Sequence, residues 1–243
     1  MNILIPMAGL GERFKNEGYR VPKFNIDIFG KSMIERALES LRIVNAQYIF
    51  ITLNVERETR TILENFCDAI LSSPPIIIDT SSLSAGPACS CLEAQKYINS
   101  NEELLIANCD QILSWNFPNF LYYARNPLFD GVIVTYESDT PKNSYAKLKR
   151  GRVVEIKEKE VISNVSLNGV HYWKRGRDFV QSALEMIANN DTAPNGEFYV
   201  GPTYNYLVDK KYITNYHIAR EQHYAVGTPD DLNLFLENFD ASL

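Results

Sequence analysis

A glycine-containing loop followed by two cations stands near the start of the chain. Gly9, Gly11 and Arg13 come just after the apolar run 3–7. Lys23 follows ten residues after Arg13. Glycine has no side chain, so φ > 0 is available and backbone N–H groups can approach an anion closely. Arg13 offers a planar fork for phosphate oxygens, and Lys23 offers a compact positive charge. The spacing predicts a loop that binds a polyphosphate.

Two common phosphate-binding loops do not match this segment. The Walker loop needs a Gly-Lys pair at a fixed spacing, and none follows Gly11. The dinucleotide fingerprint needs a third glycine where this chain has Phe14. A Gly-x-Gly pair by itself also fits a tight turn between a strand and a helix, with an incidental arginine. On these residues alone both interpretations stay open.

Charged side chains follow two further apolar runs. Asp110 comes after the run 104–109, where a hard oxygen ligand beside a phosphate loop would suit Mg²⁺. An aspartate that opens a turn is the other interpretation. Glu158 and Lys159 follow the run 152–157, and consecutive strand residues point to opposite faces. One of the two could contact a sugar hydroxyl and the other a phosphate, or both could be solvated charges.

The order of the elements that carry these residues indicates the fold class. In the first half, strand-like runs alternate with amphipathic helices, which predicts a mostly parallel sheet with ligands at the carboxyl ends of its strands. In the second half, alternating apolar residues predict antiparallel strands. We therefore expect an α/β, doubly wound, Rossmann-like fold with a smaller antiparallel sheet. The expected strands are 2–7, 47–53, 75–79, 104–108, 131–136, 145–148, 152–157, 166–173 and 215–226, and the expected helices are 32–43, 56–68, 88–98, 117–125, 177–189 and 228–239.

Length and composition limit the organisation of the chain. No linker, repeat or low-complexity segment divides the 243 residues, so we expect one domain, 1–243. Its nucleotide-binding half should be about 1–136 and its acceptor-binding half about 137–243. Ser32 followed by Glu35 is a capping-box pattern, which predicts a helix start there.

Charge and cysteine usage exclude several classes of partner. The net charge is −6 and no basic run occurs, which argues against nucleic acid. The apolar runs are far too short to span a membrane. Four cysteines without a C-x-x-C pair argue against a structural zinc site and suit a reducing compartment. We expect a cytoplasmic protein without a signal peptide.

Together these segments resemble the sugar-phosphate nucleotidyltransferases, the pyrophosphorylases that make nucleotide-activated sugars, over nearly the whole chain. The family signature G-x-G-[TS]-R…P-K is similar to the segment 9–13 with Pro22 and Lys23, although Glu12 stands where Thr or Ser is usual. The resemblance implies a GT-A-type fold with an acceptor-side sheet. Further segments similar to family motifs are 30–34, 108–111, 145–146, 158–159, 196–199 and 227–229.

The resemblance also implies an activity and a set of site residues. The expected enzyme moves NMP from an NTP, with CTP or UTP favoured, to a phosphorylated sugar or related phosphorylated alcohol. Pyrophosphate is released, and the product serves surface-polysaccharide precursor synthesis. Mg²⁺ is the implied cofactor and Asp110 its ligand. The implied catalytic residues are Arg13, Lys23 and Asp110; the nucleotide-binding residues are Met7, Ala8, Gly9, Leu10, Gly11, Gly86 and Asn108; the acceptor-binding residues are Tyr145, Glu158, Lys159, Gly169 and Glu197.

One departure from the family pattern concerns the metal. The family commonly has a second metal-binding aspartate two residues before the last glycine, Gly227, and Ala225 stands there. Either Asp110 and the nucleotide phosphates hold Mg²⁺, or Glu221 or His223 substitutes. A related glycosyltransferase would usually carry a D-x-D motif, which this chain lacks, and Ala225 motivates a non-catalytic nucleotide-sugar-binding protein as a second alternative. The acceptor stays open between a hexose or heptose phosphate, a phosphorylated polyol, a choline-like alcohol and a phosphonate, and a homo-oligomer stays open too.

Overall fold

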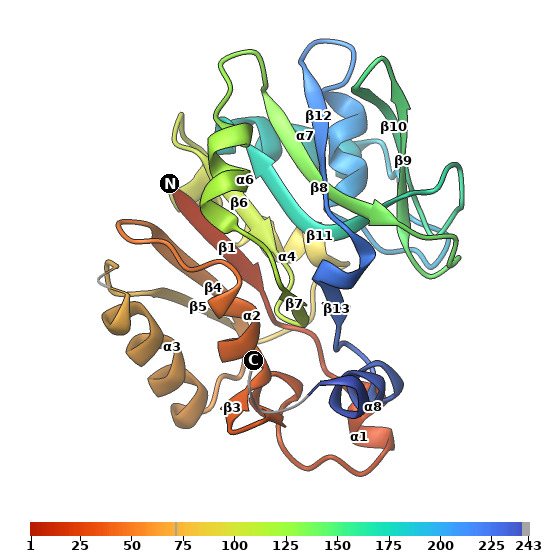
Figure 1. The fold of residues 1–243 in the computed structure, drawn as a ribbon. Coiled ribbons are helices and arrows are strands. Elements are labelled where there is room, and N and C mark those ends of the chain that lie inside the picture. Colours follow the sequence, from red (N-terminus) through yellow and green to blue (C-terminus); the bar gives the residue numbers. More distant parts are fainter. Residues whose placement is uncertain (71, 240–243) are drawn as a thin grey trace.

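A nine-stranded mixed sheet runs through the part of the chain that the computed structural model describes, residues 1–70 and 72–239. Residues 240–243 of the expected domain lie outside the described residues. Strands from both halves of the chain belong to this sheet (Figure 1). They are β1 (Asn2–Pro6), β4 (Gln47–Leu53), β5 (Ile76–Thr80), β6 (Leu104–Ala107), β8 (Gly131–Glu137), β9 (Ser144–Lys149), β10 (Arg152–Glu158), β11 (Val165–Trp173) and β12 (Ile213–His217).

The strand order places the loop after β1 beside the loop after β6. The main path is β10-β9-β11-β6-β1-β4-β5, and β8 joins β11 to β12. β1 pairs in parallel with β4 on one side and β6 on the other, and β5 is parallel to β4. β11 is antiparallel to β6, β8 and β9. The chain therefore leaves β1 and β6 at the same edge, the place where open α/β sheets bind ligands.

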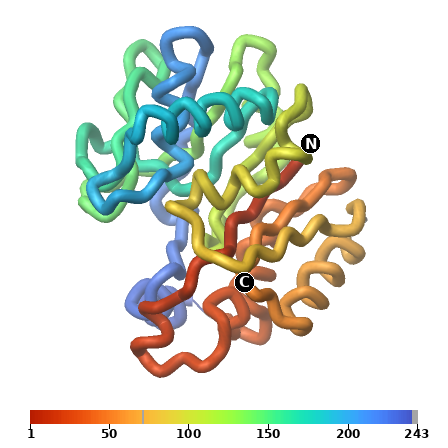
Figure 2. Tube along the Cα trace, turned by 180° about the vertical axis from the view of Figure 1, so that it is seen from behind, coloured from red at the N-terminus to blue at the C-terminus, as the bar shows by residue number. Residues whose placement is uncertain are grey.

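Helices cover both faces of this sheet. Successive residues of β1 point to opposite faces, and they are buried on both. Ile3 and Ile5 pack in a core cluster with side chains of α2, α3 and α6, whereas Leu4 packs in a second cluster with α4, α5 and α7. Figure 2 shows the second layer from behind. The first layer is α2 (Met33–Glu39), α3 (Arg57–Ala69) and α6 (Phe117–Ala124), and the second is α4 (Pro87–Leu92), α5 (Gln95–Ile98) and α7 (Gly176–Ala188).

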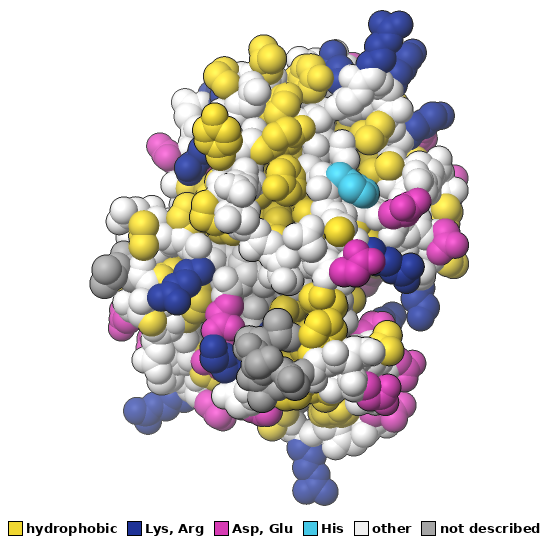
Figure 3. All heavy atoms as spheres, in the orientation of Figure 1, with side chains coloured by type: hydrophobic (Ala, Val, Ile, Leu, Met, Phe, Trp, Pro, Cys, Tyr) yellow, Lys and Arg dark blue, Asp and Glu magenta, His cyan; other side chains and the backbone are white. Residues whose placement is uncertain are grey.

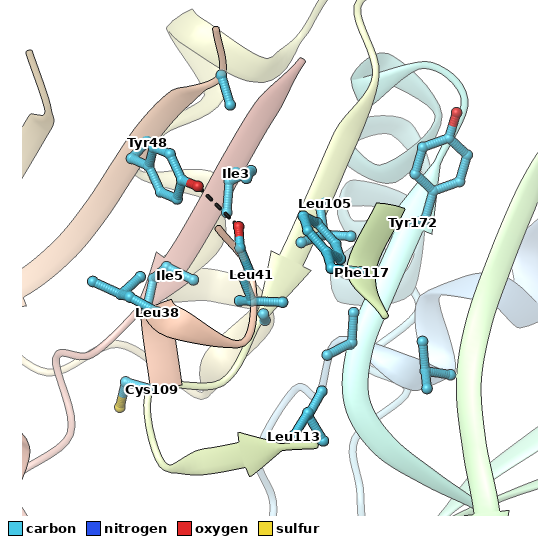
Figure 4. Packing of buried hydrophobic residues seen from close by; sticks show 14 of the residues in the cluster. Ile3, Ile5, Leu38, Leu41, Tyr48, Leu105, Cys109, Leu113, Phe117 and Tyr172 are labelled. Atoms are coloured by element: carbon cyan, nitrogen blue, oxygen red, sulfur yellow. Dashed lines mark hydrogen bonds between the residues drawn. The ribbon is translucent and has the colours of Figure 1, made fainter. Parts of the chain in front are cut away.

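Figure 4 shows side chains of the first cluster, among them Tyr48, whose buried hydroxyl has a hydrogen-bond partner. The Tyr48 ring is fully buried near Ile3 and Ile5, and its hydroxyl donates a 2.9 Å hydrogen bond to the Leu41 carbonyl. A buried hydroxyl without such a partner would cost about 1–3 kcal/mol. The bond therefore ties the end of the α2 region to β4 without that penalty.

The α/β, doubly wound fold class predicted from the sequence is confirmed, and most expected elements lie within a few residues of their observed bounds. The capping box at Ser32 is present: the Ser32 hydroxyl accepts from the Glu35 backbone N–H, and the Glu35 carboxylate accepts from the Ser32 backbone N–H. The one-domain organisation stays a prediction.

The predicted single helix 88–98 is wrong in one respect, because it is two helices. Helix α4 ends at Leu92 and α5 begins at Gln95. Between them, the backbone N–H of Glu93 bonds the Ser90 carbonyl at 3.1 Å and that of Ala94 bonds the Cys91 carbonyl at 3.1 Å. These i→i−3 bonds tighten the backbone locally and separate the two helices.

The predicted single strand 215–226 is also wrong. The chain leaves the main sheet at the end of β12 and passes through a 3₁₀ turn, η3 (Arg220–Gln222). It then forms β13 (His223–Ala225), antiparallel to β7 (Gln111–Leu113) in a separate two-stranded sheet. A run of four polar residues, 220–223, interrupts the segment where the chain passes from one sheet to the other. Which strand each end pairs with depends on distant segments, which local periodicity does not reveal.

A third cluster lies beneath the expected phosphate loop and combines both ends of the chain. Phe14 of α1 (Glu12–Asn16) packs with Val226 and with Leu232 and Phe235 of α8 (Pro229–Asn238). Figures 1 and 2 both show α1 against α8. The remaining short elements are η1 (Lys23–Asn25), β2 (Asp27–Ile28), β3 (Lys31–Ser32) and η2 (Gly201–Tyr206).

The surface in Figure 3 carries its lysines and arginines in scattered positions, with hydrophobic side chains in a band along the upper part of this face. No concentrated basic track for a phosphate backbone is visible on this face. Within residues 1–70 and 72–239, no helix combines the length and apolar character needed to cross a bilayer.

Candidate active site

A cavity of about 350 Å³ lies at the sheet edge where β1 and β6 end. We call it the main cavity. Its walls come from the loop after β1, the segment that follows β5, the residues after β6, and the start of η1. The structure brings together in its lining nine of the residues that the sequence predicts: Met7, Ala8, Gly9, Gly11, Lys23, Gly86, Asn108, Asp110 and Glu197.

The backbone conformation requires a glycine at one of the two glycine positions of the first loop but not at the other. Gly11 has φ 64°, and a Cβ there would lie 3.1 Å from the Lys23 Cβ. This conformation costs an L-residue roughly 1–2 kcal/mol. Gly9 has no such constraint, because a Cβ there would have no heavy atom within 4 Å. The space beside Gly9 is therefore open, so a ligand can approach the Gly9 backbone.

This difference leads to a paired prediction. Gly9→Ala should leave the thermal midpoint of unfolding nearly unchanged but raise the KM for the nucleotide about ten- to hundredfold, the cost of one charge-assisted hydrogen bond. Gly11→Ala should lower the midpoint as well, because of its backbone strain. Thermal unfolding and NTP saturation curves measure both effects. A Gly9→Ala enzyme with a normal nucleotide KM would contradict close approach at this position.

Lys23 and Asp110 form an ion pair in the lining of the main cavity. Pro22 fixes an extended backbone ahead of η1, and the Lys23 ammonium donates to the Asp110 carboxylate. Their side chains are 20% and 22% exposed. Burial alone would lower the pKa of Lys23, but the Asp110 carboxylate outweighs burial and raises the pKa above its ordinary value. The ammonium is thus a fixed cation in a partly dry site.

The turn at Gly227 holds this pair from below. The Val226 backbone N–H donates to the Asp110 carbonyl at 3.0 Å, which continues the pairing of β13 with β7. A Cβ on Gly227 would lie 2.6 Å from Asp110 Oδ2 and 3.7 Å from Lys23 Nζ. Only a glycine therefore lets this turn pass under the ion pair in its observed arrangement.

The residues around Asp110 can provide one carboxylate to a metal. Ala225 lies opposite Gln111 in the β13–β7 pair, directly beside Asp110, and supplies no ligand. Glu221 is exposed on η3, and the His223 ring packs against Tyr136 in a tilted arrangement, with a ring-centroid distance of 4.3 Å. Among the described residues, no group of three His, Cys, Asp or Glu side chains could hold a metal ion. The site suits Mg²⁺ held by one carboxylate and substrate phosphates, a common arrangement for this ion.

A second glycine allows two backbone segments to meet on the far wall of the main cavity. The Phe198 N–H donates to the Ala85 carbonyl at 2.9 Å, and the Ala88 N–H donates to the Phe198 carbonyl at 3.0 Å. Gly86 between them has φ 129°, and a Cβ there would lie 2.6 Å from the Phe198 backbone N. This clamp places Glu197 in the cavity lining.

A smaller cavity of about 220 Å³ adjoins the main one and shares Pro87 and Asn108 with it. We call it the side cavity. Its lining is rich in uncharged hydrogen-bonding groups and includes two of the predicted acceptor-binding residues, Glu158 and Gly169. The other lining residues are Gln111, Lys142, Asn143, Ser144, Leu167, His171, Tyr199, Val200 and Gly201.

Gly169 and Glu158 are placed in the side cavity by tight local constraints. Gly169 has φ 92°, and a Cβ there would lie 2.3 Å from Asn108 Nδ2 and 2.9 Å from Gln111 Nε2. Glu158 ends β10, where its carboxylate accepts a hydrogen bond from the Ser144 hydroxyl. Burial raises the pKa of Glu158 in spite of that bond.

Lys159 does not follow the expected alternation of strand residues. β10 ends at Glu158, and Lys159 has φ 58°, so its side chain leaves the plane of the strand. Its ammonium donates to the Tyr199 hydroxyl at 2.7 Å, and that hydroxyl donates to the Glu197 carboxylate at 2.6 Å. The chain of hydrogen bonds holds Lys159 near the junction of the two cavities, although Lys159 is in neither cavity lining.

Three further predicted site residues, besides Lys159, lie outside both linings. Leu10 and Arg13 are exposed on the loop and on α1, although Arg13 is near enough for its charge to act on Lys23. Tyr145 is fully buried, and its hydroxyl donates to the Thr140 carbonyl at 2.7 Å. Because the strand pleat turns Tyr145 into the core, its side chain supports the loop 138–143 instead of reaching the cavity.

Several lining residues were not among the predicted site residues. Ser84 and Ser90 share a 2.6 Å hydrogen bond in the wall of the main cavity. His171 and Tyr199 line the side cavity. His171 carries the one usable signal, a histidine within the otherwise apolar or aromatic stretch 170–173 of β11.

Two titratable side chains of the cavities, Cys109 and His171, are poorly suited to covalent or acid–base catalysis near neutral pH. Burial raises the pKa of the Cys109 thiol to about 12, so it stays protonated. Burial lowers the pKa of His171 to about 3, so the ring stays uncharged. What remains at the junction is a fixed cation, a carboxylate and glycine-lined backbone, which can position anions and neutralise their charge.

Comparisons with known proteins agree with this arrangement. The family model described as a MobA-like NTP transferase domain matches residues 3–154. No curated protein matches the chain.

Similar solved structures cover nearly the whole chain. A nucleoside-diphosphate-sugar pyrophosphorylase from Vibrio cholerae RC9 is 24% identical with a TM-score of 0.85, over 97% of this chain and 99% of that one. A putative glucose-1-phosphate thymidylyltransferase from Bacillus anthracis is 16% identical with a TM-score of 0.79, over 99% and 96%. The inositol-1-phosphate CTP transferase from T. maritima is 16% identical with a TM-score of 0.75, over 97% and 93%. At these identities the likeness concerns the fold.

Proposed function

The chain belongs to the family of MobA-like NTP transferase domains and is a nucleotidyltransferase, and from this premise we propose that its acceptor is a phosphorylated sugar or a related phosphorylated alcohol. The observation that carries the proposal is the pair of adjoining cavities. One has a glycine loop suited to phosphates and the other a polar lining suited to hydroxyl groups. Asn108 lines both, and the Lys23–Asp110 pair lies in the main cavity beside it.

The proposed step joins two anions without a general base. An oxygen of the acceptor phosphate, already ionised near neutral pH, attacks the α-phosphorus of the NTP in line. The new P–O bond forms as the bond from the α-phosphorus to the bridging oxygen breaks, and that electron pair leaves with pyrophosphate. Such a step depends on positioning and on charge neutralisation. The protonated Cys109 and uncharged His171 are compatible with this chemistry.

Each charged residue then has a proposed role. Lys23 bridges the acceptor phosphate and the α-phosphate, and Arg13 contacts the β- and γ-phosphates from the edge of α1. Lys159 binds the acceptor phosphate, and Glu158 accepts hydrogen bonds from acceptor hydroxyls. Asp110 holds Mg²⁺ together with the nucleotide phosphates, and bound Mg²⁺ would lessen the repulsion between the anions.

We also propose that the donor is CTP or UTP and that the product supplies surface-polysaccharide synthesis. Two structures with the same fold carry names of pyrimidine nucleotidyltransferases, a thymidylyltransferase and a CTP transferase.

Pyrophosphate release tests this function. Four NTPs are each combined with glucose 1-phosphate, inositol 1-phosphate, phosphocholine and aminoethylphosphonate in the presence of Mg²⁺. We expect pyrophosphate to form with CTP or UTP and a hydroxylated acceptor, and an NDP-linked product to appear in equal amount. Nucleotide binding without pyrophosphate from any pair would contradict the proposal.

A further inference from the structure

Two residues of the side-cavity lining carry buried polar atoms without a hydrogen-bond partner in the described part of the chain. Within the described residues, five buried side-chain atoms lack a hydrogen bond, and two of them, Gln111 Oε1 and His171 Nδ1, belong to residues of the side-cavity lining. Asn168 Nδ2 and Trp173 Nε1 belong to the same strand as His171, and His223 Nε2 is on the strand paired with β7. Such atoms normally find a protein, water or ligand partner.

His171 is the most constrained member of this group. Its position in β11 pairs with Ile106 of β6 and Ile133 of β8, so a polar side chain enters an apolar layer. The side chain is 5% exposed, and its ring centroid lies 6.0 Å from those of Trp173 and Tyr204. Its buried Nδ1 has no hydrogen-bond partner among the described residues. The packing fixes the ring while one edge meets the cavity.

The rest of the lining suits an acceptor whose body, the part beyond its phosphate, carries hydroxyl groups. It does not suit a body that carries a positive charge. Asn143 and Ser144 provide uncharged polar groups beside Gln111. A quaternary ammonium needs free aromatic faces, and the Lys159 ammonium already lies 4.8 Å from the Tyr199 ring centroid. Lys142 also lines the cavity and would repel a cation. Glu158 could attract one, but burial raises the pKa of its carboxyl and so disfavours the charged form.

We propose that His171 is a specificity-determining residue: its imidazole hydrogen-bonds one hydroxyl group of an uncharged, polyhydroxylated acceptor body, and the side cavity disfavours acceptors with a cationic body. This inference rests on the proposed function, because it concerns the acceptor of that reaction. The phosphate of the acceptor lies at the junction of the cavities and its hydroxylated body against β11.

The test removes hydroxyl and imidazole separately and together. Pyrophosphate release is measured with glucose 1-phosphate, its monodeoxy derivatives, inositol 1-phosphate and phosphocholine, for the wild-type protein and His171→Phe. We expect one deoxy derivative to lose roughly three- to tenfold in kcat/KM with the wild type. His171→Phe should lose the same factor with the parent acceptor, show no further loss with that derivative, and keep its KM for the NTP.

Two further variants separate a hydrogen bond from a packing effect. His171→Gln keeps a hydrogen-bonding group and should retain part of the discrimination, whereas His171→Leu replaces His171→Phe if the larger ring does not fold. His217→Phe changes an exposed histidine on β12 and should leave acceptor selectivity unaltered.

The outcomes distinguish the inference from the function on which it rests. Two results would overturn the inference and leave the proposed function standing. In one, His171→Phe releases pyrophosphate and discriminates between the parent acceptor and its deoxy derivatives as the wild type does. In the other, the wild type prefers phosphocholine as acceptor. Absence of pyrophosphate with every acceptor in the wild type would overturn both.

Discussion

Lys23→Ala will lower turnover by about 10²–10³, the usual cost of one charge-stabilising contact, while the protein stays folded. The ammonium of Lys23 is the fixed cation of the main cavity, and its pKa is raised by Asp110, so it is charged throughout the neutral range. Its loss leaves the two reacting phosphates without that positive charge. Steady-state pyrophosphate release measures the effect, and circular dichroism checks the fold.

The control for this variant is a second lysine in an ion pair away from the cavities. Lys31 pairs with Glu39 on the surface, with side chains 45% and 40% exposed. Exposed pairs contribute about 0–1 kcal/mol, so Lys31→Ala should change neither turnover nor stability noticeably. Near-normal turnover in Lys23→Ala would remove Lys23 from the mechanism, and equal losses in both variants would indicate a general effect of charge.

Asp110→Asn is expected to lower turnover by a factor of about 10² or more, because a neutral amide is a poor Mg²⁺ ligand. The cost should appear as a strong rise in the Mg²⁺ concentration needed for half-maximal rate. The asparagine keeps the size and shape of the side chain that lies close to Gly227. Saturation with Mg²⁺ at fixed NTP measures the shift.

A direct binding measurement tests the role of Asp110 in metal binding separately from turnover. In the wild type, Mg²⁺ should tighten NTP binding in calorimetry, and in Asp110→Asn this gain should shrink. Glu39→Gln, which removes the carboxylate of the surface pair, serves as the matched control. An Asp110→Asn protein with an unaltered Mg²⁺ requirement would show that another group holds the ion, and Glu221 and His223 would then be the next residues to change.

Local signals in the sequence identified the parts of the site that lie close to one another along the chain. The apolar run of β1 followed by Gly9 and Gly11 predicts a buried strand and a glycine loop at its end, because periodicity and backbone freedom are local properties. The capping box at Ser32 is equally local and is present. The alternation of strands and helices predicted the carboxyl edge as the ligand-binding edge.

Sequence patterns failed where the direction of a side chain depends on a distant segment. Tyr145 lies near the expected position, but the pleat turns it into the core. Lys159 follows a strand in the sequence, yet its left-handed backbone redirects the side chain to Tyr199. The segment 215–226 was predicted as one strand, yet its two ends pair with β8 and β7 in different sheets.

By itself the sequence determined the class of the fold, the glycine loop and the identities of the charged residues, because strand and helix periodicity and turn chemistry act over a few residues. Only the tertiary structure decided that Lys23 pairs with Asp110, 87 residues away, and that the turn at Gly227 passes beneath them. It also placed His171 on the wall of a polar cavity. These juxtapositions depend on strand order and register, which arise when distant segments bury their apolar faces together.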